Sequence, residues 1–317
     1  MRLVFFGTPE SAVPTLEASV AAGHEIARVV TRPDRPVGRS RRPQPPPVKS
    51  AALRHGLTIE QPEKIRGHGF RETLASCAPD VLVVVAFGKI LPRRLLDTGR
   101  LGAVNVHFSK LPAYRGAAPV QWALAEGNTT TGVTTMLMNE RLDEGDILLT
   151  EDVAIHPGEH APALTARLAA TGATLLVRTL DGLGSGSLTP RPQDHDAASY
   201  APILRREDGR ADFSLPARLV EGRVRGFDPW PGVWAERRGR RLRLVEAVDH
   251  GDGSADGPDG RVLAVENDAA IVACGHGTTL AIRAVQFEGR RVLTVREAVN
   301  GRQLEVGDTL EPAAARA

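Results

Sequence analysis

The chain has 317 residues, of which 42% are hydrophobic, and its formal net charge is +2. This length allows two domains of ordinary size, each with its own core. The 32 glycines and 23 prolines are too few for a collagen-like or fully disordered chain. The two cysteines, Cys77 and Cys274, stand far apart and match neither a disulfide framework nor a zinc-ligand spacing, so we expect no metal site.

The first apolar run of the sequence passes directly into Gly7 and shows neither the hydrophobic region nor the cleavage site of a secretory signal. No stretch approaches the roughly 20 apolar residues that a membrane-spanning helix needs. We therefore expect a cytoplasmic protein.

Short apolar runs alternate with segments of helical periodicity over the first half of the chain. The runs predict strands over 3–6, 25–30, 81–86, 102–106, 132–138 and 147–153. The helical spacing of apolar residues predicts helices over 10–22 and 161–183. This alternation is typical of an α/β fold of the Rossmann-like type, in which helices flank a mostly parallel sheet.

The composition changes after residue 186. Proline, aspartate and arginine mix over 191–207 and predict a linker. Short β-like runs then follow one another over 233–236, 242–248, 260–265, 269–273 and 278–285. Closely spaced short strands favour a small β-barrel of the OB-like type. We therefore expect a catalytic domain over 1–190, a linker over 191–207 and a C-terminal β-barrel domain over 208–317.

Polar side chains follow two of the predicted strands. Asn105 and His107 stand two residues apart at a strand end, so their side chains share one face. Asp143 lies in a tight turn at 142–146 after another strand. Ligands of such sheets bind beyond the carboxyl ends of the strands, and we expect Gly88, Asn105 and this turn at or near those ends. The sequence leaves open whether Asp143 or Asp146 faces the histidine.

An amide, an imidazole and a carboxylate suit direct transfer of an acyl group to an amine. Asn105 and protonated His107 can donate hydrogen bonds to the oxyanion of a tetrahedral intermediate. A nearby carboxylate favours the charged imidazole and helps to move protons. No serine or cysteine stands in a nucleophile elbow, so we expect no covalent enzyme intermediate. Taken alone, however, an Asn-x-His pair and an Asp-rich turn are more often structural.

Several segments resemble the methionyl-tRNA formyltransferases, and together they extend over nearly the whole chain. In order they read VFFGTP (4–9), TRPDRPVG (31–38), PVK (47–49), VVVAFGKILP (83–92), NVHFSKLPAYRGAAPVQ (105–121), LDEGD (142–146), ASYAP (198–202) and FDPWPG (227–232). Each motif is modest evidence, whereas their joint occurrence in this order is specific.

The resemblance implies that 10-formyltetrahydrofolate donates the formyl group and that the amino group of initiator methionyl-tRNA accepts it. It implies catalytic roles for Asn105, His107 and Asp143. It also implies folate contacts from Phe87 and Gly88 and from a turn made of Ser109, Lys110, Leu111 and Pro112. Lys110 replaces the apolar residue that is usual in the family, and its side chain would either face solvent or reach the acidic tail of the folate.

Basic residues gather in two stretches. Six of them lie between 32 and 49 against one acid, in a proline-rich loop that by itself predicts a solvated arm. The resemblance instead implies tRNA contacts there, which we assign to Arg35, Arg39, Arg41 and Arg42. A second cluster lies in the predicted barrel, and we assign further tRNA contacts to Arg237 and Arg238, with general surface charge as the alternative. We expect the protein to act as a monomer.

Three alternatives remain at this point. A formyltransferase acting on an amino-sugar nucleotide or on glycinamide ribonucleotide would share Asn-x-His and the distant aspartate without needing the basic loop. A nicotinamide-dependent oxidoreductase would carry G-x-G-x-x-G after its first strand, where this chain has GTPES. A non-catalytic RNA-binding module would not need Asn105 or His107.

Overall fold

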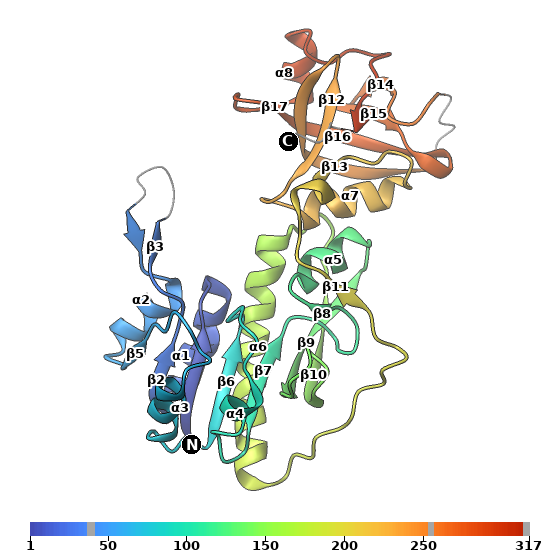
Figure 1. Ribbon diagram of the computed structural model, residues 1–317. Helices are drawn as coiled ribbons and strands as arrows, with labels where there is room; N and C mark the ends of the chain where they lie inside the picture. The colour runs from blue at the N-terminus through green and yellow to red at the C-terminus, as the bar shows by residue number, and fades with distance from the viewer. Residues whose placement is uncertain (37–41, 253–256, 313–317) are drawn as a thin grey trace. The chain divides into compact units, whose positions relative to one another are not determined.

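The computed structural model describes residues 1–36, 42–252 and 257–312 (Figure 1). The chain forms two compact units. The first contains Met1–Pro119, Thr130–Ala154 and Thr165–Ala201, and the second contains Val120–Thr129, Ile155–Leu164 and the chain from Pro202 onward. Segments 120–129 and 155–164 thus group with the C-terminal part of the chain.

A seven-stranded sheet forms the centre of the first unit, in the order β10-β9-β7-β6-β1-β2-β5. Its strands are β1 (Arg2–Gly7), β2 (Glu25–Val30), β5 (Ile59–Glu60), β6 (Val81–Val85), β7 (Ala103–His107), β9 (Thr130–Leu137) and β10 (Asp146–Ala154). Five neighbouring strands run parallel, namely β5, β2, β1, β6 and β7. Val84 of β6 pairs with Phe6 of β1 on one side and with Asn105 of β7 on the other. The predicted Rossmann-like, mostly parallel sheet is confirmed.

The last two strands of this sheet run antiparallel. β9 pairs with β7 through Val104↔Leu137 and His107↔Thr134, and β10 pairs with β9. The turn 138–145 that joins them is shorter than the dozen or more residues that a parallel crossover requires, so they form a hairpin. The turn that holds Asp143 therefore leaves the sheet beside the amino-terminal part of β7. The turn then folds back, so that the carboxylate of Asp143 lies beside His107, the last residue of β7, and the prediction that the turn lies near the carboxyl ends of the strands is confirmed.

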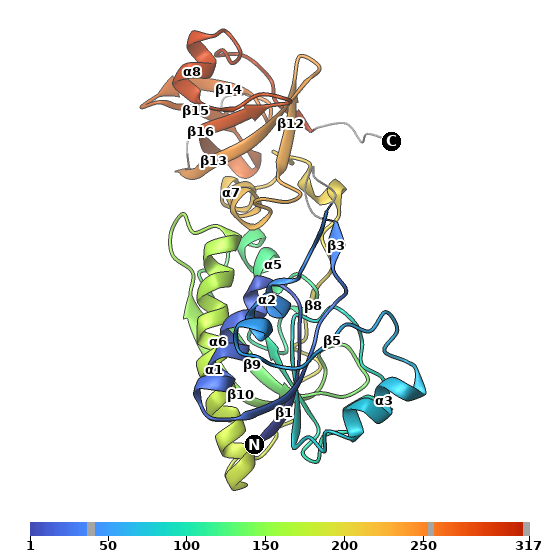
Figure 2. The ribbon, with the colours of Figure 1, turned by 90° about the vertical axis from the view of Figure 1, so that its left-hand side faces the viewer.

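Helices cover both faces of the sheet. They are α1 (Val13–Ala21), preceded by the single turn η1 (Glu10–Ala12), α2 (Pro47–Arg54), α3 (His68–Ala75), α4 (Arg93–Leu96) and α6 (Ala161–Ser185). Figure 2 shows α1 and α6 on one side and α3 on the other. At Gly172 of α6, a Cβ atom would stand 2.8 Å from Cγ1 of Val106 in β7. Because side chains alternate along a strand, α6 covers the face of β7 opposite to Asn105 and His107.

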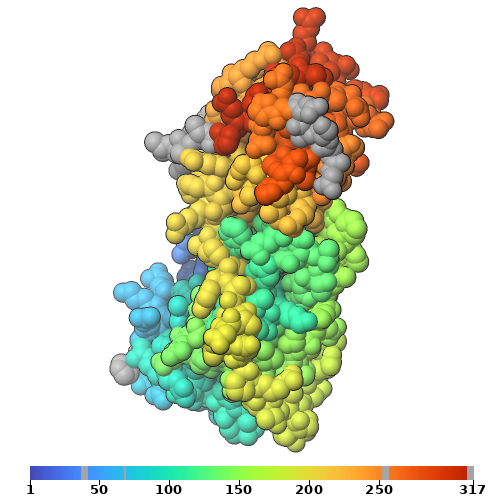
Figure 3. Space-filling view, turned by 90° about the vertical axis from the view of Figure 1, so that its right-hand side faces the viewer, coloured from blue at the N-terminus to red at the C-terminus, as the bar shows by residue number. Residues whose placement is uncertain are grey.

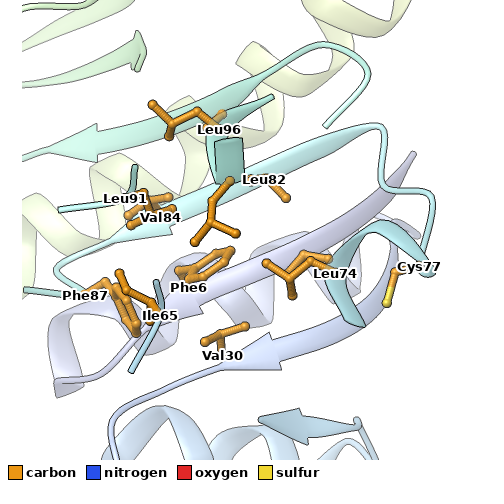
Figure 4. Packing of buried hydrophobic residues seen from close by; sticks show 13 residues of the cluster. Phe6, Val30, Ile65, Leu74, Cys77, Leu82, Val84, Phe87, Leu91 and Leu96 are labelled. Atoms are coloured by element: carbon orange, nitrogen blue, oxygen red, sulfur yellow. The ribbon is translucent and has the colours of Figure 1, made fainter. Parts of the chain in front are cut away.

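A buried core extends along the sheet face that carries Asn105 (Figure 4). Phe6 and Val84 of the strands pack there with Leu74 of α3 and with Phe87, which follows β6. The rings of Phe6 and Phe87 meet edge to face, with centroids 5.3 Å apart. Parallel strands are buried on both faces, which explains why β6 consists of valine and leucine alone.

Residues 186–199 follow α6 and run over the surface of the first unit (Figure 3). Arg191 forms an isolated bridge with Ile147, and β11 (Tyr200–Ala201) then pairs in parallel with β8 (Arg115–Gly116). Most side chains of this segment are exposed, and Gln193 is the one that is buried. The predicted linker therefore contains a residue that is built into the first unit.

An antiparallel sheet dominates the second unit, in the order β14-β15-β16-β13-β12-β18, with β17 paired to β16. Its strands are β12 (Val233–Arg237), β13 (Arg240–Asp252), β14 (Val262–Glu266), β15 (Ala269–Ala273), β16 (Thr278–Phe287), β17 (Val292–Thr294) and β18 (Glu311–Pro312). The register between β13 and β16 shifts at three places, and such bulges bend and twist a strand so that the sheet curls. The predicted small C-terminal β domain is confirmed.

Helices complete the second unit. They are α7 (Ala217–Gly226), α8 (Val295–Asn300), most of α5 (Pro119–Ala125) and the single turns η2 (Arg206–Gly209) and η3 (Gly275–Gly277). Two glycines let α7 lie against α5, because Cβ atoms at Gly222 and Gly226 would stand 2.3 and 2.5 Å from carbonyl oxygens of that helix. Over the described ranges, no helix combines the length and the apolar character needed to cross a bilayer.

Candidate functional site

The three predicted catalytic residues lie together on the face of β7 that α6 leaves free. The turn 138–145 folds back over this face, where Asn105 Nδ2 donates a hydrogen bond to Asp143 Oδ1 over 3.3 Å. His107 Nδ1 lies 3.8 Å from Asp143 Oδ2, and both side chains are about nine-tenths buried or more. The carboxylate that faces the histidine is therefore that of Asp143, whereas Asp146 begins β10.

The backbone around the site defines which nitrogen of His107 carries a hydrogen. Nε2 lies 2.9 Å from the carbonyl oxygen of Tyr114. A carbonyl can only accept, so Nε2 is protonated and donates this bond. Nδ1 is then the ring nitrogen that this bond leaves available, and it is the one that faces Asp143.

A cavity of about 440 Å³ opens beside these residues and lies within the first unit. This volume is within the range of pockets that bind cofactor-sized ligands, roughly 300–1,000 Å³. Its wall combines the three polar side chains with apolar groups, among them Val84, Phe87, Ile90, Leu91, Met138 and Leu142. The wall therefore suits a largely apolar ligand with a few polar groups.

The predicted folate residues divide into two groups. Phe87 and Gly88 line the cavity, whereas the turn 109–112 does not contribute to its wall. Ser109 is fully buried and its hydroxyl donates to Ala113 O over 2.6 Å. Thr134 in β9 ties the same turn to the sheet, because its hydroxyl donates to Ser109 O and accepts from Leu111 N. In this structure the turn supports the strand that carries His107.

Lys110 points away from the cavity wall. Its Nζ forms an ion pair with Asp152 of β10 over 2.8 Å, and both side chains are more than half exposed. The Lys110 side chain is thus exposed to solvent, and its contact with the acidic tail of the folate stays a prediction.

A second, more polar cavity of about 630 Å³ adjoins the first, and both share Gly88 and Lys89. Arg32, Arg35 and Lys89 line it together with two acids, Asp34 and Glu63. Hydrogen bonds from the side chains of Gln61 and Lys49 hold the pKa of Asp34 below its usual value. The cavity wall therefore keeps fixed charges of both signs.

The predicted tRNA-binding loop begins at the edge of this second cavity. Arg35 lies in β3 (Arg35–Pro36), which pairs antiparallel with β4 (Pro43–Gln44), and Arg35 and Arg42 are exposed. Arg39 and Arg41 lie outside the residues that the structure describes. Two of the four predicted arginines are thus placed on an exposed hairpin.

The two predicted arginines of the barrel differ in exposure. Arg238 is 65% exposed, whereas Arg237 is buried and its guanidinium pairs with Asp308 and Glu305. If a buried guanidinium left its two carboxylate partners to bind a phosphate, the interaction free energy lost would exceed the free energy gained from the exposed phosphate contact. The assignment of Arg237 to tRNA is therefore corrected to a structural ion pair, and Arg238 stays a prediction.

Three residues near the site were not predicted from the sequence. The backbone N–H of Gly116 donates to Asp143 Oδ2 over 2.8 Å. Gln193 donates to the carbonyl oxygens of Asp143 and Gly145 and accepts from the buried Arg115. Gly116 and Arg115 fall within the long motif at 105–121, whereas no local pattern marks Gln193.

Comparisons with known proteins identify the family. A family model described as "Formyl transferase" matches residues 1–180, and one described as "Formyl transferase, C-terminal domain" matches residues 203–303. The methionyl-tRNA formyltransferase of Acidobacterium capsulatum is 47% identical over 96% of this chain and 97% of its own length. That of Solibacter usitatus is 46% identical over 98% of both chains.

Solved structures share the fold at much lower identity. A crystal structure of WlaRD, described as a sugar 3N-formyl transferase with dTDP and 5-N-formyl-THF, has a TM-score of 0.66 at 13% identity and covers 92% of this chain and 99% of its own. An N-formyltransferase from Helicobacter canadensis, in complex with folinic acid and dTDP-3-aminofucose, has a TM-score of 0.64 at 13% identity, covering 88% and 98%. With near-full-length identity above 40% to curated relatives, this chain is a formyl-transferring enzyme of the methionyl-tRNA formyltransferase family.

Proposed function

We propose that this protein transfers the formyl group of 10-formyltetrahydrofolate to the amino group of initiator methionyl-tRNA. The observation that carries the proposal is the gathering of Asn105, His107 and Asp143 on the wall of the 440 Å³ cavity. The name that the near-full-length relatives share supports the choice of acceptor.

The reaction needs no covalent bond to the enzyme. The amine nitrogen attacks the formyl carbon, a tetrahedral oxyanion forms, and the bond from that carbon to N10 of the folate then breaks. The amide group of Asn105 has two N–H donors, of which one is used on Asp143, so the other can bind the oxyanion. Protonated His107 donates to the same oxygen from Nδ1. Each such donor contributes about 10²–10³ in rate.

The proton of the attacking amine must reach N10. In the proposed relay Asp143 accepts this proton, His107 gives its Nδ1 proton to N10, and Asp143 then restores the proton on Nδ1. The 3.8 Å between Nδ1 and Oδ2 exceeds a hydrogen bond, so this last transfer requires the two side chains to approach each other or a water that bridges them from one side. The products are the formamide and tetrahydrofolate, and the enzyme returns to its starting state.

We further propose that residues 1–190 form the catalytic domain, that 191–207 link it to a tRNA-binding domain over 208–317, and that exposed arginines bind the tRNA backbone. The contacts come from Arg35 and Arg42 of the hairpin, from Arg39 and Arg41 between them, and from Arg238. Each arginine that neutralises a phosphate releases counterions, so binding should weaken steeply with salt.

Formyl transfer to charged initiator tRNA tests the proposal, with uncharged tRNA and a dTDP-linked amino sugar as alternative acceptors. Of these acceptors, we expect only methionyl-tRNA to be formylated. We expect kcat to fall at least 100-fold in Asn105→Ala and in His107→Ala, while the affinity for tRNA is retained. Transfer to the amino sugar but not to methionyl-tRNA would refute the acceptor. Normal turnover of both variants would refute the catalytic roles.

A further inference from the structure

Gln193 lies 50 residues after Asp143 in the chain, yet it joins the turn that carries that residue. It comes from the largely exposed segment 186–199 and is itself only 5% exposed. We propose that Gln193, oriented by Arg115, is a positioning residue that fixes the backbone of Asp143 for the reaction. This inference rests on the proposed role of Asp143.

All polar atoms of the Gln193 side chain are used. Nε2 donates to Asp143 O over 2.9 Å and to Gly145 O over 2.7 Å. Oε1 accepts from Arg115 Nε over 3.1 Å and from Arg115 Nη2 over 2.8 Å. Because a guanidinium only donates and a carbonyl only accepts, the amide can lie in one orientation.

Arg115 is held as firmly as the amide that it orients. Its side chain is 2% exposed, Nη2 also contacts His195 Nδ1 at 3.0 Å, and Nη1 lies 3.8 Å from Glu144 Oε1. The next residue, Gly116, donates its N–H to the Asp143 carboxylate. Residues 115 and 116 therefore fix Asp143 at two points, the carboxylate directly and the backbone through Gln193.

The turn needs such support because its backbone is strained and leaves the sheet. Asp143 has a φ of +53°, a conformation that is unfavourable for a residue with a Cβ atom and persists only where neighbours impose it. At Gly145 a Cβ atom would stand 1.9 Å from Leu137 O, so the turn passes very close to β9. An error of about 1 Å at Asp143 would cost as much as 100-fold in rate.

The decisive variant is Gln193→Glu. A carboxylate keeps the bonds from Arg115 but turns an acceptor toward two carbonyl oxygens, so the turn should shift. We expect kcat for formyl transfer to methionyl-tRNA to fall about 10- to 100-fold with both KM values within about twofold. Gln286→Glu is the matched control, because Gln286 also donates to a backbone carbonyl, that of Arg290, and lies in the second unit. Its kcat should not change.

A double-mutant cycle with Asp143→Asn separates positioning from general support of the fold. If Gln193 acts through Asp143, Gln193→Glu should lower kcat by less than about twofold in the Asp143→Asn background. The reason is that the effects of mutating residues that act as a unit are not additive. Gln193→Met, which is apolar and of similar size, repeats the cycle should the glutamate variant fail to fold. Additive losses, or wild-type kcat in the single Gln193 variant, would overturn the inference. Full activity of Asp143→Asn would instead refute the proposed function.

Discussion

Gly116 donates its backbone N–H to the carboxylate of Asp143 over 2.8 Å, and a glycine is required there. Its φ is +123°, and a Cβ atom would stand 2.5 Å from Ala201 O, the partner of Gly116 in the pairing of β8 with β11. β8 and β11 can therefore approach each other this closely only because residue 116 has no side chain, and the hydrogen bond to the Asp143 carboxylate depends on that approach.

Gly116→Ala should separate these segments and weaken the hold on Asp143. We expect kcat to fall about 10- to 100-fold. Gly158→Ala is the control, because Gly158 also has a positive φ, +71°, but a Cβ there meets nothing within 4 Å. It should lower the free energy of unfolding by about 1–2 kcal/mol without changing kcat. Equal kcat for the two variants would contradict this account of the site.

A close contact between α6 and β7 fixes the face from which the site is built. Gly172→Ala would place a Cβ 2.8 Å from Val106 Cγ1, and such overpacking costs about 1–3 kcal/mol. Gly184→Ala in the last turn of the same helix meets only Met1 at ordinary distances, so its better helix propensity should stabilise by up to about 1 kcal/mol. Urea unfolding of both variants measures the difference, and the same sign for both would contradict the packing.

Replacing Lys110 tests whether its side chain in the turn 109–112 binds the folate tail. Its Nζ is engaged with Asp152 and lies off the cavity wall, so Lys110→Leu should leave the KM for 10-formyltetrahydrofolate within about twofold. The exposed ion pair contributes at most about 1 kcal/mol to stability. A larger rise in KM, especially for a donor with several glutamates, would show that the lysine reaches the ligand.

Cys274 should resist alkylation in the folded protein. Burial, with the nearby charges of Asp259 and Asp249, raises the pKa of its thiol to about 12, and the thiolate is the reactive form. In a Cys77→Ala background, iodoacetamide at pH 8 should label Cys274 only after guanidinium unfolding, as mass spectrometry would show. Rapid labelling of the folded variant would contradict the burial.

The same pKa shift predicts the sign of a pH effect on stability. The folded state favours the neutral thiol, so this contribution is complete below the ordinary pKa of 9.0 and is lost as pH rises toward about 12. Cys274→Ala should therefore lose stability less steeply than the parent between pH 9 and 11. Identical slopes in urea unfolding would contradict the assignment.

The elements of the sheet could be predicted from the sequence because each one is a local signal. The strand predicted over 25–30 is β2, and that predicted over 81–86 is β6, one residue shorter. Buried parallel strands are short continuous apolar runs bounded by polar residues or glycine, and this pattern needs no knowledge of the partner strand. The helices α2 and α3 were not predicted, because each has only eight residues and therefore shows little of the helical periodicity on which such a prediction depends.

The sequence by itself determined the fold class and the two-part organisation, and its motifs, through their resemblance to a known family, predicted the three site residues at 105, 107 and 143. Only the tertiary structure decided that β9 and β10 turn back as a hairpin, that Asp143 rather than Asp146 meets the histidine, and that Gln193 holds the turn. Strand direction and contacts between residues 50 apart depend on how distant segments pack, and a hydrogen bond leaves no periodic mark in a sequence. The sequence also does not show which charged residues are buried. Arg115 and Arg237 look like surface charges in the sequence, yet both are buried because the fold supplies each with hydrogen-bonding partners.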